Sequence, residues 1–71
     1  RWAEAQATLE KALLADPSSP DIHLRLGLVL ANQGQLPQAA TYFEKALKLR
    51  PGDPDAQRNL KIIQGLINGG Q

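Results

Sequence analysis

The strongest constraint on this chain is an internal repeat with a period of 34 residues. The tetrapeptide Glu-Lys-Ala-Leu occurs at residues 10–13 and again at 44–47, and Pro-Asp occurs at 20–21 and 54–55. Further matches at the same offset join Ala5 to Ala39, Pro17 to Pro51, Leu26 to Leu60 and, conservatively, Leu9 to Phe43. A fixed period of this length indicates one supersecondary unit that stacks on copies of itself.

Turn residues divide the period into helices. Ser19 and Asp53 each precede a proline, which places a capping side chain at the N-cap and proline in the first turn. Pro17 and Pro51 end the preceding helices, because proline disfavours the α conformation of the residue before it. Gly34 suits the left-handed position after a helix. We therefore predict four helices, near residues 2–15, 20–33, 37–50 and 54–67.

Short turns between these helices predict an all-α fold of antiparallel helix hairpins. The chain has 71 residues, a formal net charge of +1, no cysteine and one histidine. A domain this small has a small core, and neither disulfides nor a metal site can reinforce it. Self-association would therefore be a natural way to bury more apolar surface.

The repeat resembles the tetratricopeptide repeat (TPR), a helix-turn-helix unit with the pattern W-x2-L-G-x2-Y, A-x3-F and P. Residues 23–30 fill the first part, Ala39 and Phe43 the second, and Pro51 the last. His23 and Leu30 replace the usual aromatic residues, and the remaining positions match. The resemblance implies a right-handed TPR solenoid that serves as a protein-interaction scaffold rather than an enzyme.

The resemblance also divides the chain. Residues 1–19 look like the second helix of a truncated repeat, 20–53 like a complete repeat, 54–67 like a C-terminal capping helix and 68–71 like a flexible tail. Lys61 takes the small-residue position of the last helix, which suits a polar cap. The chain opens within a helical pattern and without an initiator methionine, so we expect it to be a fragment.

A candidate binding surface lies on the segment 20–33, which is apolar nearly all round. Leu26, Gly27 and Leu30 share the face expected to contact the partner helix, and Val29 is expected to touch the preceding repeat. The resemblance places the apolar stripe, formed by Leu24, Leu28 and Ala31, in the concave groove. It places Asp21, Asn32 and Arg58 at the polar margin of that groove.

Two interpretations of the apolar stripe remain open. It accepts an apolar helix or an extended peptide of a protein partner, or it is covered by the parent chain or by a second copy in a homo-oligomer. The lysine and asparagine clamp with which chaperone-binding members of the family hold a carboxylate is absent, because Leu24, Leu28 and Asp55 fill those positions.

Other function classes find little support in the sequence. His23 lacks the further ligands that a metal needs, and Ser19 is explained as a helix cap, so we expect no enzyme, no cofactor and no metal. Lys11, Lys45 and Lys48 alternate with glutamates, which disfavours nucleic-acid binding. RNA binding, or service as a non-catalytic part of an enzyme, is a distant alternative. No segment predicts membrane insertion, so we expect a soluble protein, with the cytoplasm slightly favoured and the compartment otherwise unknown.

Overall fold

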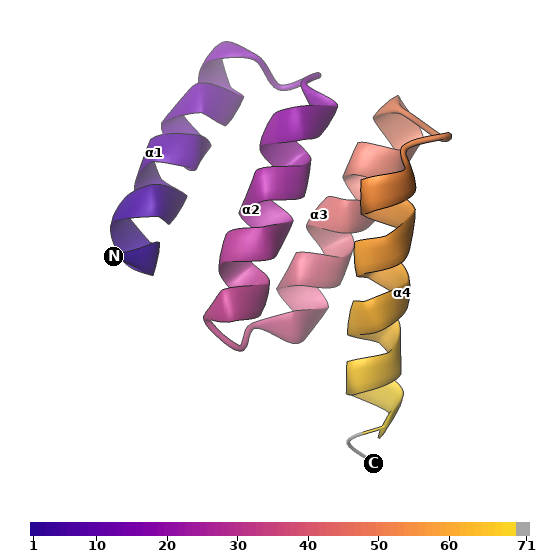
Figure 1. Cartoon of the computed structure of the whole chain (residues 1–71). Coiled ribbons are helices and arrows are strands. Elements are labelled where there is room, and N and C mark those ends of the chain that lie inside the picture. The colour runs from indigo at the N-terminus through magenta and orange to yellow at the C-terminus, as the bar shows by residue number, and fades with distance from the viewer. Residues whose placement is uncertain (70–71) are drawn as a thin grey trace.

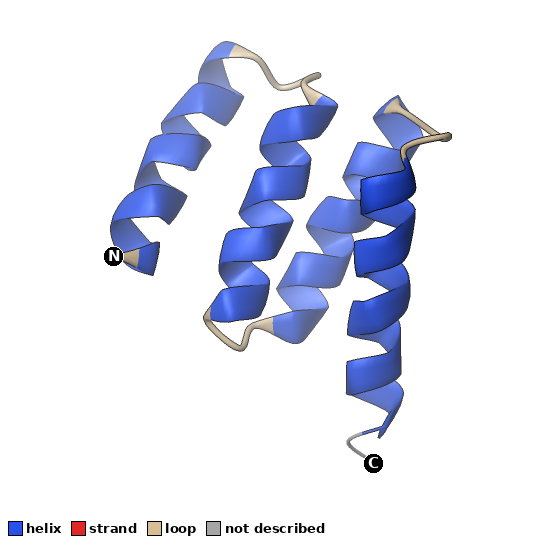
Figure 2. Ribbon diagram, in the orientation of Figure 1, coloured by secondary structure: helices blue, strands red, loops and turns tan. Residues whose placement is uncertain are grey.

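The computed structural model describes residues 1–69 and has four helices and no strand in that range. The helices are α1 (Trp2–Ala15), α2 (Pro20–Asn32), α3 (Leu36–Leu49) and α4 (Pro54–Gly69), as Figures 1 and 2 show. The predicted all-α class of stacked hairpins is confirmed. The predicted starts of all four helices agree with the structure to within one residue.

The end of α4 differs from the prediction. We expected the helix to end at residue 67, whereas it continues through Asn68 and Gly69. Both residues are exposed, so no buried contact fixes where the helix ends, and helix boundaries of this kind fray. Residues 70 and 71 of the predicted flexible tail lie outside the described residues.

The caps and turns follow the predicted local chemistry. Ser19 Oγ accepts a hydrogen bond from the amide of Ile22 at 3.3 Å and so caps α2. Asp53 Oδ1 accepts from the amide of Asp55 at 3.0 Å and from that of Ala56 at 3.4 Å and so caps α4. Gly34 has a φ of 82°, the left-handed conformation expected between α2 and α3. These contacts satisfy backbone donors at the helix starts and fix the short turns.

The core is centred on α3. Leu30 of α2, Ala39 and Phe43 of α3, and Ile63 of α4 form one buried cluster. Gly27 lies directly against the Phe43 ring, because a Cβ built on Gly27 would come within 2.6 Å of it. The glycine therefore sets how closely α2 approaches α3.

The helices form a thin slab whose Cα extents are 37 × 29 × 13 Å. α3 packs against both α2 and α4, and α1 packs chiefly against α2. Figure 1 shows α3 behind α2 and α4, with α1 at the edge of the slab. This placement leaves α1 without a buried residue.

Candidate protein-interaction surface

Three large apolar side chains are exposed on α2 and α4. Leu28 of α2 is 38% exposed, and Ile62 and Leu66 of α4 are 52% and 56% exposed. Leu28 and Ile62 are 34 residues apart, so they hold the same position in successive repeats. Leu66 lies one helical turn after Ile62 and therefore shares its face. We call these three residues the apolar row.

The predicted apolar stripe is only partly open to solvent. Leu24 and Ala31 are half-buried, and both pack against the core cluster of Leu30, Ala39, Phe43 and Ile63. Leu28 is the most exposed of the three stripe residues. The stripe therefore has a structural role at two of its positions and leaves Leu28 accessible to solvent.

The polar residues expected at the margin are exposed and engaged in local contacts. Asp21 pairs with Arg50 at 3.6 Å, and Arg58 pairs with Asp55 at 3.5 Å. Asn32 donates its side-chain amide to the carbonyl oxygen of Leu28 at 2.8 Å. Exposed ion pairs of this kind contribute little to stability, so a partner can replace them at small cost.

Sequence reasoning missed the α4 half of the apolar row. The sequence repeat indicates this position, because adding the repeat offset of 34 to Leu28 gives Ile62. The same offset pairs Leu24 with Arg58 and Asn32 with Leu66. Applying the offset to every groove position would have identified both missed residues.

The sequence profile of the tetratricopeptide repeat family matches residues 1–54. The chain belongs to the TPR family. The match confirms the predicted family and fits the observed helical-hairpin fold. Repeats of this family typically act as non-catalytic scaffolds for protein interaction. A search of the curated proteins gave no significant match.

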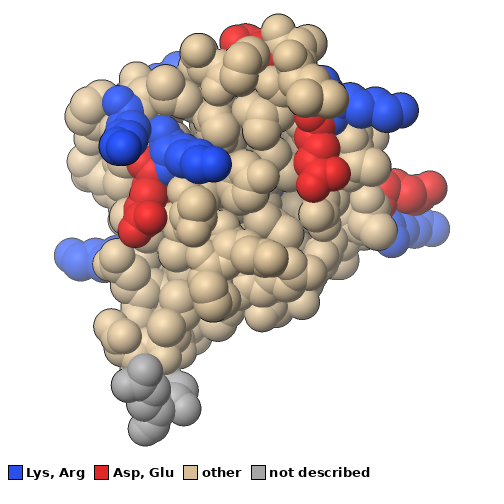
Figure 3. Space-filling model, turned by 180° about the vertical axis from the view of Figure 1, so that it is seen from behind, with Lys and Arg blue, Asp and Glu red and all other residues tan. Residues whose placement is uncertain are grey.

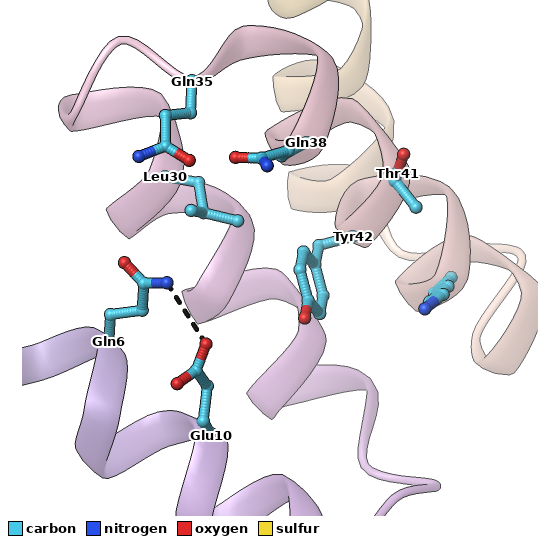
Figure 4. Close-up of a pocket in the computed structure, with 8 residues that line it drawn as sticks. Gln6, Glu10, Leu30, Gln35, Gln38, Thr41 and Tyr42 are labelled. Carbon is cyan, nitrogen blue, oxygen red and sulfur yellow. Dashed lines mark hydrogen bonds between the residues drawn. The ribbon is translucent and has the colours of Figure 1, made fainter.

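A hollow with several polar side chains, the polar hollow, lies between α1 and α3 of the TPR array. Figure 4 shows Gln6 and Glu10 on one side, Gln38 and Tyr42 on the other, and Leu30 between them. Gln6 donates to Glu10 at 3.2 Å. Figure 3 views the molecule from the α3 side, where charged side chains lie on the upper part and at the sides of the face and the lower centre is uncharged. Polar and apolar atoms share the lining of this hollow about equally.

The single histidine has a structural environment in this TPR chain. His23 is 6% exposed, and its Nε2 lies 3.0 Å from the carbonyl oxygen of Pro17. A carbonyl oxygen can only accept, so Nε2 carries the hydrogen and donates it. Its ring centroid lies 5.9 Å from that of Tyr42. These contacts hold the turn before α2 against α3 and leave little of the ring for a ligand.

Neither a metal site nor a membrane span emerges from the described part of the TPR chain. Within residues 1–69, no three side chains of histidine, cysteine, aspartate or glutamate are grouped to hold a metal ion. None of the helices described is long and apolar enough to cross a membrane.

Proposed function

We propose that this TPR chain is a scaffold that binds a protein partner through the surface formed by α2 and α4. By the TPR resemblance, we expect this surface to be the concave one. The observation that supports the proposal is the apolar row, which continues from one repeat to the next. An exposed apolar patch is costly for a soluble domain and is common at interaction sites. An apolar helix or an extended peptide of the partner would cover the row.

The chemistry of the surface favours apolar anchors over charged ones. Burial of the surface that is now exposed would contribute about 1 kcal/mol of binding free energy at each residue of the apolar row, Leu28, Ile62 and Leu66. The margin carries both signs of charge, because Asp21 pairs with Arg50 and Arg58 pairs with Asp55. A partner is therefore selected mainly by the spacing of its apolar side chains, and the charged margin sets its orientation.

A displayed peptide library selected on the intact chain tests this proposal. Recovered peptides are labelled and titrated against the unchanged chain, an Ile62→Asp variant and a Leu14→Asp control. Leu14 is 85% exposed on α1, so the control removes an exposed leucine outside the row. We expect Ile62→Asp to weaken binding by at least about tenfold and the control to leave it unchanged. Equal binding to all three proteins would contradict the proposal.

Self-association is the second candidate, favoured by the small core and by the absence of a buried residue in α1. In that case a second copy of the chain covers the same apolar row. Sedimentation across a concentration series distinguishes the two functions. A dimer that Ile62→Asp converts to a monomer supports self-association, whereas a monomer at all concentrations leaves the row to a foreign partner.

A further inference from the structure

A groove runs between α1 and α3, and we call it the α1–α3 groove. Its floor is α2, because Leu30 lines the polar hollow and His23 lines a second hollow nearer the other end of α2. Leu30 and Leu28 are two positions apart, so they point about 200° apart around α2, at about 100° per residue. The groove and the apolar row are therefore separate surfaces on opposite sides of α2.

The second hollow, which we call the lysine hollow, has a mostly apolar lining with a basic margin. Leu13 of α1 and Pro17 of the following turn lie on one side, and Leu49 of α3, which is 43% exposed, lies on the other. Lys45 and Lys48 of α3 also line it. Among the described residues, neither of these ammonium groups forms an ion pair. Two unpaired positive charges thus lie beside an apolar hollow of about 430 Å³.

The two hollows adjoin, because Lys45 lines both of them. Its Nζ lies 5.3 Å from the centroid of the Tyr42 ring, which belongs to the polar hollow shown in Figure 4. Gln38, Tyr42, Lys45 and Leu49 are spaced by four, three and four positions and so form one wall along α3. This wall spans about 16 Å at about 1.5 Å per residue, the length of about five residues of extended chain. The wall along α1 has the same kind of spacing and consists of Gln6, Glu10 and Leu13.

The internal repeat shows that a further helix pair would not cover this groove. Gln38 and Lys45 of the α3 wall correspond to Glu4 and Lys11 of α1, 34 positions earlier. Glu4 is two positions from Gln6, so it lies about 200° around α1 from the groove. Another repeat beside α1 would therefore form its own groove on that opposite side. The α1–α3 groove stays open in a longer array.

The lining of the groove matches an extended segment that carries acidic residues. The side-chain amides of Gln6, Gln35 and Gln38 can each donate and accept, so the polar hollow suits the N–H and C=O groups of an extended backbone. A helix satisfies most of these groups internally and would need the amides less. The lysine hollow suits an apolar side chain with a carboxylate beside it, because its lining is apolar and its margin is basic.

We infer that the α1–α3 groove is a second docking surface, which binds an extended segment of a partner protein with an apolar side chain next to aspartate or glutamate. The apolar side chain enters the lysine hollow, and the carboxylate lies beside Lys45 and Lys48. The adjoining backbone crosses the polar hollow. Because the groove and the apolar row lie on opposite sides of α2, the chain can hold two protein segments at once.

A displayed library of random peptides, selected on the Ile62→Asp chain, tests this inference. That substitution disrupts the apolar row and leaves every residue of the groove unchanged. We expect the recovered peptides to be enriched in aspartate or glutamate adjacent to a large apolar residue. Their affinity for the unchanged chain should fall as the salt concentration rises, because both lysines are exposed. Recovery of no peptide, or of peptides without acidic residues, would overturn the inference.

Charge-matched variants localise the site. The double variant Lys45→Glu/Lys48→Glu should weaken the recovered peptides by at least about tenfold. The control, Lys11→Glu/Lys61→Glu, makes the same change in net charge outside the groove, and Lys11 is the repeat equivalent of Lys45. We expect the control to leave the affinity nearly unchanged. Equal losses in the two double variants would mean that only the net charge of the chain matters, which would overturn the inference.

A second matched pair tests the apolar part of the site. Leu49→Asp should weaken the peptides by at least about tenfold, whereas Leu14→Asp, at an 85% exposed leucine outside the groove, should not. Ile62→Asp should also leave the affinity unchanged, so failure of this inference is distinguishable from failure of the proposed function. Circular dichroism verifies that each variant remains helical. Equal binding by the Leu49→Asp and Leu14→Asp variants would overturn the inference, and so would a dimer that Leu49→Asp converts to a monomer, because a second copy would then fill the groove.

Discussion

Gly27 is the residue whose size most directly determines the packing of the two central helices. Gly27→Ala gains up to about 1 kcal/mol of helix propensity but forces a Cβ to within 2.6 Å of the buried Phe43 ring. Overpacking costs of about 1–3 kcal/mol outweigh that gain. We expect a net loss of about 1 kcal/mol in the free energy of unfolding, measured by urea denaturation.

Gly65 is the matched control for this prediction. It is also helical, and a Cβ built on it meets no other atom within 4 Å. Gly65→Ala should therefore raise the free energy of unfolding by up to about 1 kcal/mol. The two substitutions should have opposite signs, and stabilisation by both would contradict the close approach of α2 to α3.

Asp53 supports the start of α4 through its side-chain acceptor. Asp53→Ala removes both hydrogen bonds to the first turn and should reduce the free energy of unfolding by about 1–2 kcal/mol. Asp53→Asn keeps the side-chain oxygen and should reduce the free energy of unfolding clearly less. Thermal denaturation of the two variants provides the measurement. Equal losses would show that the charge of Asp53, which lies 3.9 Å from Arg50, matters more than its capping.

Local residue chemistry was predictable where it depends on neighbours in sequence. Ser19, Gly34 and Asp53 were identified because a cap or a left-handed turn is determined within a few residues. The contact of His23 with Pro17 was not predicted, because it depends on how the turn before α2 closes onto α3. Sequence alone assigned that ring only a packing or surface role.

At the scale of the element, α1 and α3 have similar sequences and different surroundings. α3 packs against two helices and contributes Ala39, Phe43 and Ala46 to the core, whereas α1 packs chiefly against α2 and has no buried residue. Local opening costs less where few apolar contacts are lost. We expect the amides of α1 to exchange with solvent at least about tenfold faster than those of α3, measured by hydrogen–deuterium exchange.

Equal protection of the two helices in the free chain would contradict the account of α1 as a partly covered element.

The exposed face of each helix was less predictable than its boundaries. The segment 20–33 is apolar nearly all round, so periodicity could not decide which leucines become buried. Tertiary packing decides, and it places Leu24 against the core and leaves Leu28 exposed. In α4, Lys61 predicted a polar cap. The exposure of Ile62 and Leu66 on the neighbouring face was not predicted.

At the scale of the whole molecule, the repeat predicted the architecture because each hairpin contacts mainly its neighbours. Charge pairs contribute little to the stability of this arrangement. Arg50 pairs with Asp21, and Arg58 pairs with Asp55, with more than half of each side chain exposed. Raising the salt concentration from about 0.1 to 1 M NaCl should therefore change stability by less than about 1 kcal/mol through these pairs.

Urea denaturation at the two salt concentrations checks this expectation. A large loss of stability at high salt would mean that ion pairing, rather than the apolar core around Phe43, holds the hairpins together. A modest gain is compatible with the account, because salt strengthens the burial of apolar surface.

Methyl chemical-shift mapping by NMR tests most directly whether the apolar row binds a protein partner. The chain is labelled at its leucine and isoleucine methyl groups and titrated with a peptide recovered from the displayed library. We predict that the largest shifts occur at Leu28, Ile62 and Leu66, with Leu14 unchanged. Shifts confined to α1, or to Leu30 in the polar hollow, would contradict the claim.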